Sequence, residues 1–110
     1  MSSPLVGVDV GGTKIAAALV TPDGRLGRTV ERPTPAADGP AAVLDAIAEA
    51  VRALPGHRSA RGVGVGTGGV VDRRHGVVRS ANALLPGWAG TDLRAELGAR
   101  LGLPVVADND

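Results

Sequence analysis

The stretch Leu5 to Val20, LVGVDVGGTKIAAALV, decides the fold, because it consists of two apolar runs joined by a pair of glycines. Valines alternate with Gly7 and Asp9 in the first run, which is the pattern of a half-buried strand. The second run is apolar and long enough for another strand. The sequence therefore predicts a strand, a tight turn at Gly11 and Gly12, and a second strand.

The composition of this turn suits a phosphate. Glycine has no Cβ and tolerates positive φ, so successive backbone N–H groups can converge on an anion. Thr13 adds a hydroxyl and Lys14 a cation. Asp9 would repel a phosphate unless Mg²⁺ or its water lies between them, so the hypothesis is a nucleotide with its metal. The alternative is an ordinary Gly-Gly hairpin in which Asp9 is a solvated or turn-bonding residue.

Two other nucleotide motifs fail in this chain. The residues after Gly12 come in the wrong order for a P-loop, and they lead into a strand rather than a helix. The run from Gly64 to Gly69 fits G-x-G-x-x-G, but β-branched residues and a charged turn follow it. No helix opens there, so the dinucleotide-binding interpretation loses its structural context.

Composition limits the class of protein. The chain has 110 residues, a net charge of +1 and no cysteine. This length predicts a single domain, and the balanced charge argues against nucleic acid or a membrane surface as the main partner. The absence of cysteine excludes disulfides and thiolate metal sites in this segment. No apolar run approaches a membrane span, and Asp9 interrupts the only stretch that a signal peptide would use, so we expect a cytoplasmic protein.

After the first hairpin, strands and helices alternate. Residues 25–31 predict a third strand, which completes an antiparallel meander. Residues 40–54 predict a helix, and the strand predicted at 62–66 follows it as a crossover, so it can run parallel to the first strand. A second helix is predicted at residues 93–101, before a buried strand at 105–107 that ends at polar residues, where open α/β sheets bind ligands.

An irregular segment, residues 80–90, precedes the second helix. It contains prolines, glycines and Trp88, the only aromatic residue of the chain. Trp88 is either a wall of a ligand site or an apolar plug over the edge of the sheet, and the plug is the preferred interpretation.

Four segments resemble the N-terminal domain of the ROK family (repressors, uncharacterised reading frames and sugar kinases). They are DVGGTK at 9–14, GVGTGGVVD at 64–72, SAN with PGW between 80 and 88, and LPVVADND at 103–110. Their order and spacing match along almost the whole chain. The resemblance implies an α/β fold of the ribonuclease H-like, actin/hexokinase type. Its mixed sheet would combine an antiparallel three-strand meander with parallel strands and two main helices.

The resemblance also implies roles for individual residues. One group corresponds to the motif that binds the ATP phosphates: Asp9, Gly11, Gly12, Thr13 and Lys14. A second group corresponds to the positions that bind the sugar: Gly68, Gly69, Asn82, Asn109 and Asp110. Asp110 also corresponds to the catalytic base, and Asp9 to the residue that positions Mg²⁺, directly or through water. Gly68 stands where the family often has Pro, which leaves the shape of the sugar-side loop open.

The chemistry of these residue types agrees with those roles. In a loose phosphoryl-transfer transition state the alcohol loses its proton late, so an aspartate that orients the hydroxyl is sufficient. Asparagine both donates and accepts hydrogen bonds, as a vicinal diol requires. Asp108 is left without a role.

The function implied is ATP- and Mg²⁺-dependent phosphorylation of a hexose hydroxyl, of the glucokinase type. Residues 1–110 would then be the N-terminal actin-like domain, cut before the C-terminal nucleotide-binding lobe and inactive alone. The resemblance places a structural Zn²⁺ site in the missing part and makes the full-length protein a homodimer. The sugar and the choice between ATP and polyphosphate stay open. The alternatives are an inactive remnant and a sugar-sensing ROK regulator, whose helix-turn-helix has no room before Leu5.

Overall fold

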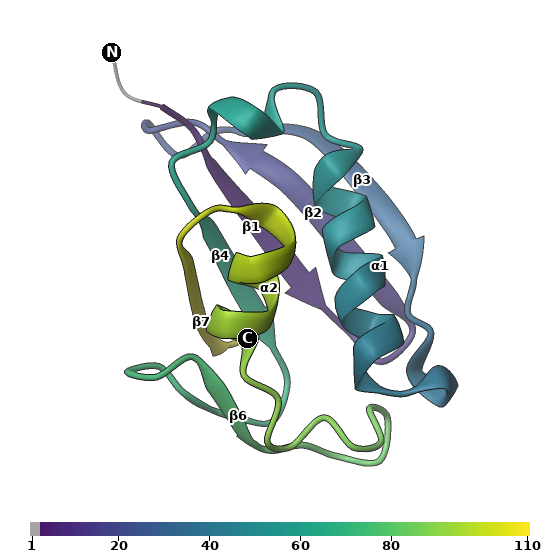
Figure 1. Cartoon of the computed structure of the whole chain (residues 1–110). Helices are drawn as coiled ribbons and strands as arrows, with labels where there is room; N and C mark the ends of the chain where they lie inside the picture. Colours follow the sequence, from purple (N-terminus) through teal and green to yellow (C-terminus); the bar gives the residue numbers. More distant parts are fainter. Residues whose placement is uncertain (1–2) are drawn as a thin grey trace.

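A five-stranded sheet is the centre of the computed structural model, which describes residues 3–110 (Figure 1). Its strands are β1 (Leu5–Val10), β2 (Lys14–Val20), β3 (Leu26–Pro33), β4 (Val63–Thr67) and β7 (Val105–Asn109), in the order β3-β2-β1-β4-β7. Strands β1, β2 and β3 form an antiparallel meander, whereas β4 runs parallel to β1 and β7 runs parallel to β4. The predicted mixed sheet is confirmed.

Both long helices, α1 (Pro40–Arg52) and α2 (Leu93–Leu101), cover the same face of this sheet (Figure 1). Two short 3₁₀ turns, Ala36–Asp38 and His57–Ser59, flank α1 in the chain. Within the described residues, neither helix has the length and apolar character that a membrane crossing requires.

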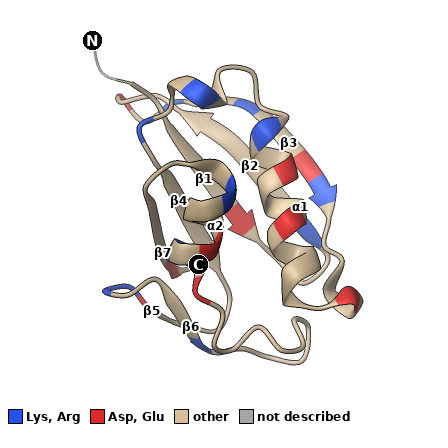
Figure 2. Ribbon diagram, viewed as in Figure 1, with Lys and Arg blue, Asp and Glu red and all other residues tan. Residues whose placement is uncertain are grey.

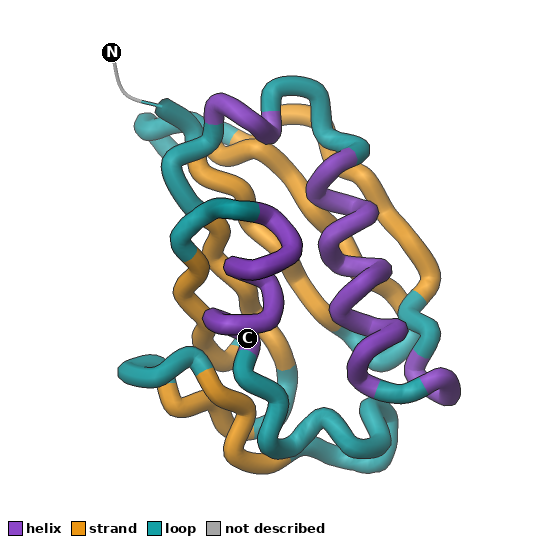
Figure 3. The backbone as a smooth tube through the Cα atoms, viewed as in Figure 1, coloured by secondary structure: helices purple, strands orange, loops and turns teal. Residues whose placement is uncertain are grey.

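A second sheet of two strands, β5 (Val70–Asp72) and β6 (Val77–Ser80), lies beyond the carboxyl ends of β1 and β4. Figure 3 shows this hairpin and the long loop that follows it at the same end of the molecule. Because parallel strands present their carboxyl ends together, this end of the sheet is where a ligand site is expected.

The helix boundaries follow from local chemistry. Pro40 occupies the first turn of α1, where its missing N–H costs nothing, and the preceding Gly39 adopts φ 92°. The Asp92 carboxylate accepts a hydrogen bond from the Ala95 N–H at 3.0 Å and caps α2. Gly102 ends α2 in the left-handed conformation, with φ 67°.

The core lies between the sheet and the helices. Val6, Val8 and Val10 point alternately from β1 into it, and each is at most 5% exposed. Ile47 and Val51 of α1 face them and are fully buried. Since the chain has no Phe or Tyr, this core consists of aliphatic side chains apart from Trp88.

Two strands, β3 and β7, end two residues later than the sequence predicts. The third strand extends from the predicted residue 31 to Pro33, because β3 is the edge of the sheet and an edge strand tolerates proline. The last strand extends from the predicted Ala107 to Asn109, because Asp108 and Asn109 pair with Gly66 and Thr67 of β4.

Candidate active site

The turn between β1 and β2 keeps two backbone donors free. The Gly11 N–H donates to the Lys14 carbonyl at 2.9 Å, and Thr34 Oγ1 donates to the Gly11 carbonyl at 2.8 Å. In the described part of the chain, the N–H groups of Gly12 and Thr13 donate to no other residue. Two adjacent free N–H groups are suited to an anion.

Two carboxyl groups from different strands meet beside this turn. Asp9 belongs to β1 and pairs with Gly66 of β4, while Asp110 follows β7. Gly66 leaves room for this meeting, because a Cβ there would lie 2.9 Å from Asp110 Oδ1. The Asp110 N–H donates to the Thr67 carbonyl at 3.0 Å, which fixes the backbone of Asp110. Figure 2 shows acidic residues at the neighbouring ends of β1 and β7.

The surroundings of the Asp110 carboxyl favour its protonated form. Loss of water around its carboxyl raises the pKa of Asp110, although the residue as a whole is exposed. The negative charge of Asp9 and a hydrogen bond to its carboxylate raise the pKa of Asp110 further. A carboxylate with a raised pKa is a stronger base, so the pair makes Asp110 better able to accept a proton.

A cleft of about 210 Å³ connects the turn with Asp110. It is lined by Val10, Gly11, Gly12, Gly68, Ala81, Asn82, Leu84, Leu85 and Asp110. Asn82 Oδ1 accepts a hydrogen bond from the Leu84 N–H at 2.9 Å, which leaves the side-chain NH₂ of Asn82 as a donor. The loop also packs directly on the turn, because a Cβ on Gly12 would lie 2.7 Å from Leu84 Cβ. The predicted phosphate turn and the predicted base therefore share one cleft.

Comparison with known proteins identifies the family. The model of the ROK family matches residues 5–110. The chain belongs to the ROK family. The predicted actin/hexokinase type of fold is confirmed, because solved ROK kinase structures share the fold of this chain.

The relatives of this ROK chain include sugar kinases. It is 43% identical over 106 residues to a glucokinase of Streptomyces coelicolor, a match that covers 96% of the chain and 32% of the relative. It is similar to the structure of a ROK family glucokinase from Streptomyces griseus in complex with glucose and AMPPNP. That likeness has a TM-score of 0.86 and 36% identity, and covers 96% of this chain and 33% of the other.

A third similar structure is an inorganic polyphosphate/ATP-glucomannokinase from Arthrobacter. Its TM-score is 0.80 at 40% identity, and the likeness covers 99% of this chain and 45% of the other. The ROK chain spans about a third of the length of the S. coelicolor glucokinase.

Asn109 of the ROK chain holds the loop that follows β4. Its Oδ1 accepts a hydrogen bond from the Val71 N–H at 2.8 Å, and its Nδ2 donates to the Gly69 carbonyl at 2.9 Å. A carboxamide has two hydrogens and two lone pairs, so one of each stays available for a ligand. The backbone conformation at Gly69 requires a glycine, because φ is 91° there and a Cβ would lie 2.1 Å from the Ser80 carbonyl oxygen.

Lys14 and the Thr13 side chain lie outside the cleft of the ROK chain. Lys14 Nζ forms an ion pair with Glu31 Oε2 at 3.2 Å, and both side chains are exposed. Thr13 and Lys14 line a separate hollow of about 310 Å³ together with Glu31, Arg32 and Pro33. The structure thus brings the Gly11–Gly12 turn to Asp110 without the Lys14 side chain.

Two site residues of the ROK chain escape prediction from sequence, namely Gly66 and Thr67. Gly66 belongs to a failed dinucleotide motif and to a segment of the family resemblance, but neither assigns it a role, and its contact with Asp110 depends on the order of the strands. A signal exists, since glycines replace side chains on one face of a strand whose other face is apolar. Thr67 carries no sequence signal of its own.

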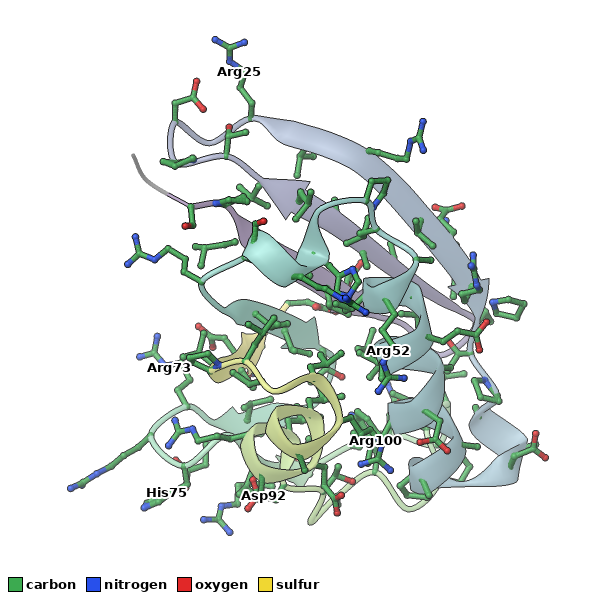
Figure 4. The ribbon with its side chains drawn as sticks, turned by 45° about the horizontal axis from the view of Figure 1, so that its top comes forward. Arg25, Arg52, Arg73, His75, Asp92 and Arg100 are labelled. Atoms are coloured by element: carbon green, nitrogen blue, oxygen red, sulfur yellow. The ribbon has the colours of Figure 1, made fainter. Side chains whose placement is uncertain are left out.

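Asp72 stabilises the hairpin that borders the site. Its Oδ2 accepts hydrogen bonds from Arg79 Nη2 and His75 Nδ1, each at 2.8 Å. The Arg79 guanidinium first, and His75 second, hold the pKa of Asp72 well below its usual value. In Figure 4, Arg73 and His75 lie at the tip of this hairpin, and Arg73 Nη1 pairs with Asp108 Oδ2 at 3.3 Å.

Proposed function

We propose that this chain is the N-terminal third of a sugar kinase, which transfers the terminal phosphoryl group of ATP to a hexose hydroxyl. The observation that carries the proposal is the shared cleft, which is lined by Gly11 and Gly12 of the turn and by Asp110. The Gly12 N–H in this cleft has no partner in the described residues. The S. griseus glucokinase, which resembles this chain, binds glucose and an ATP analogue. That complex supports ATP as the donor and glucose as the first sugar to test.

The turn would hold the phosphates. The N–H groups of Gly12 and Thr13 are oriented by the hairpin and have no partner in the described residues, so a phosphate oxygen can accept from both. Gly11 allows the turn to close tightly, because a Cβ there would lie 3.0 Å from the Lys14 carbonyl oxygen. Positioning of this kind supplies most of the catalysis in phosphoryl transfer.

Asp110 would accept the proton of the sugar hydroxyl. Phosphoryl transfer through a loose transition state needs this proton removed late, so a carboxylate that orients the hydroxyl is adequate. Burial and Asp9 raise the pKa of Asp110, which makes its carboxylate more basic. The negative phosphate and the neighbouring carboxylate would repel one another without a cation.

The Asp9–Asp110 pair fits Mg²⁺ by the nature of its donors. Mg²⁺ prefers oxygen ligands and is usually held by one or two carboxylates together with substrate phosphates. Residues 3–110 contain no group of three acidic, histidine or cysteine side chains that would form an all-protein cage. Asp9 would hold the metal, directly or through water, and the metal would neutralise charge on the phosphates.

Asn82 and Asn109 would bind the sugar. The free NH₂ of Asn82 lines the cleft, and Asn109 keeps one donor and one acceptor beside its two backbone bonds. Because an unpaired buried polar group is costly, such a site discriminates against sugars that lack the matching hydroxyl. Gly68 lines the same cleft and would let the sugar approach the backbone.

The remaining protein groups that contact the substrates would come from the part of the protein outside this chain. A cleft of about 210 Å³ is smaller than the roughly 300–1,000 Å³ of complete small-molecule pockets. The adenosine site and a structural Zn²⁺ site would lie in that part, in a cytoplasmic homodimer.

A chimera tests the function. It is the S. coelicolor glucokinase in which the segment corresponding to residues 5–110 is replaced by those residues of this chain, so the turn, Asn82 and Asp110 all come from this chain. We expect it to phosphorylate glucose with ATP and Mg²⁺. The Asp110→Asn variant should lose about 10²- to 10⁴-fold in kcat, the usual contribution of a general base.

Asp108→Asn is the matched control, because Asp108 is two residues away, exposed, and paired with Arg73 instead of lining the cleft. Its kcat should stay close to that of the unchanged chimera. Equal rates for the Asp110→Asn and unchanged chimeras would remove Asp110 from the mechanism. A chimera that phosphorylates no sugar would contradict the proposed function.

A further inference from the structure

Trp88 is buried beneath the loop that carries Asn82. Its indole is 1% exposed, and its Nε1–H donates to Thr67 Oγ1 at 3.1 Å. Thr67 is 0% exposed, so water does not compete for this bond. A buried donor with one acceptor is held in place by that acceptor, because losing the bond would leave the N–H unpaired. Trp88 is therefore the predicted apolar plug and is also fixed in place by a hydrogen bond to Thr67.

The same Thr67 holds the strand ends on either side of it. Its backbone pairs with Val10 of β1 and with Asn109 of β7. Its carbonyl accepts the Asp110 N–H at 3.0 Å. Thr67 therefore contacts three parts of the site, namely the strand that leads to the phosphate turn, the backbone of the base, and Trp88.

Two consecutive turns connect Trp88 with Asn82. The Trp88 N–H donates to the Leu85 carbonyl at 3.1 Å, and the Leu85 N–H donates to the Asn82 carbonyl at 3.3 Å. Leu85 is itself 6% exposed, so this part of the loop has little freedom to move separately. A displacement of the indole would thus displace Asn82 relative to Asp110.

We propose that Thr67 is a positioning residue for the sugar, because its hydroxyl, acting through Trp88, sets the position of Asn82 relative to Asp110. The inference rests on the proposed function, in which Asn82 and Asp110 hold the sugar. Neither Thr67 nor Trp88 is among the described residues that line the cleft, so both act through other residues.

Four variants separate this role from general stability. Thr67→Val replaces the hydroxyl with a methyl group and leaves the indole N–H without its acceptor, whereas Thr67→Ser keeps the acceptor. Trp88→Phe removes the donor and keeps an aromatic plug. Thr91→Val is the control, because Thr91 lies in the same segment, is 9% exposed, and takes no part in the bond.

The bond itself is observable in the 110-residue chain. Trp88 is the only tryptophan, so the ¹H–¹⁵N spectrum contains a single indole N–H signal. Thr67→Val should move this signal and speed its exchange with water, while Thr67→Ser and Thr91→Val should leave it near its original position. An unchanged signal in Thr67→Val would show that the bond does not form, and would overturn the inference.

The effect of the Thr67–Trp88 bond on sugar binding is measured in the chimera. Thr67→Val and Trp88→Phe should each raise the KM for glucose about tenfold, the effect of losing one well-placed hydrogen bond, while the KM for ATP stays the same. Thr67→Ser should restore the original KM. The double variant should be no worse than Thr67→Val alone, which removes both the bond to Trp88 and the longer donation of Thr67 Oγ1 to the Gly68 carbonyl at 3.4 Å.

Two failures are distinguishable. If the unchanged chimera phosphorylates no sugar, the proposed function fails and this inference fails with it. If it is active and Thr67→Val has the same glucose KM as Thr91→Val, only the positioning role is refuted. Additive effects of Thr67→Val and Trp88→Phe would also refute it, because they would show that the two residues act independently.

Discussion

Gly66 is the residue at which a single added carbon atom would most directly disturb the proposed chemistry. Its backbone is compatible with alanine, since its φ is not positive, but the Cβ would lie 2.9 Å from Asp110 Oδ1. The carboxyl of Asp110 must then shift from its position in the site. Because a displacement of about 1 Å can cost a catalytic group about 10²-fold, we expect Gly66→Ala to lower kcat of the chimera by about 10- to 100-fold.

Gly64 provides the matched control for this substitution. It lies two residues earlier on the same face of β4, and the nearest atom to its added Cβ would be Val106 Cγ2 at 4.0 Å. Gly64→Ala should therefore keep kcat close to the original value, measured with saturating glucose and ATP. Equal kcat for the two alanine variants would show that the contact between Gly66 and Asp110 does not matter.

At the scale of elements, the β5–β6 hairpin is held by the acidic side chain of Asp72. Arg79 and His75 lower its pKa, so its ionised form is favoured in the folded state. The stabilisation is present above the usual aspartate pKa of 3.8 and is lost as the pH falls through the lowered value. Asp72→Asn should thus lower Tm at pH 7, and the difference from the original protein should shrink below about pH 3.

Thermal unfolding followed by circular dichroism at both pH values measures this effect. Glu49→Gln is a suitable control, because Glu49 also pairs with an arginine, Arg32, but lies on the exposed side of α1. A Tm difference for Asp72→Asn that stays constant with pH would show that ionisation of Asp72 does not stabilise the hairpin.

The strands and helices are largely predictable from sequence, but the ends of the strands and the side-chain contacts between them are not. Alternation of valines and glycines is enough to predict β1, β2 and β4, because one face of each strand is buried. The end of β7 was missed because Asp108 and Asn109 are polar, and only their pairing with β4 makes them part of a strand. Local sequence contains no information about such a pairing.

The candidate site is likewise only partly predictable from sequence. The rule that open α/β sheets bind ligands at the carboxyl ends of their strands predicts a site at the polar residues after the last strand, and the cleft lined by Asp110 agrees with it. The bond between Thr67 and Trp88 joins residues 21 positions apart and depends on how the loop folds back. It could be found only with coordinates.

At the scale of the whole molecule, the cleft of this chain is small for the proposed reaction. The turn, Asn82 and Asp110 line a hollow of about 210 Å³, and the chain corresponds to 32% of the length of the S. coelicolor glucokinase. A phosphoryl transfer that relies on positioning needs both substrates held on all sides and shielded from water. We therefore expect the purified 110-residue protein to show no measurable phosphorylation of glucose with ATP and Mg²⁺, while the chimera is active under the same conditions in a coupled assay. Turnover by the 110-residue protein that disappears in its Asp110→Asn variant would contradict this expectation, because it would show that these residues alone complete the site.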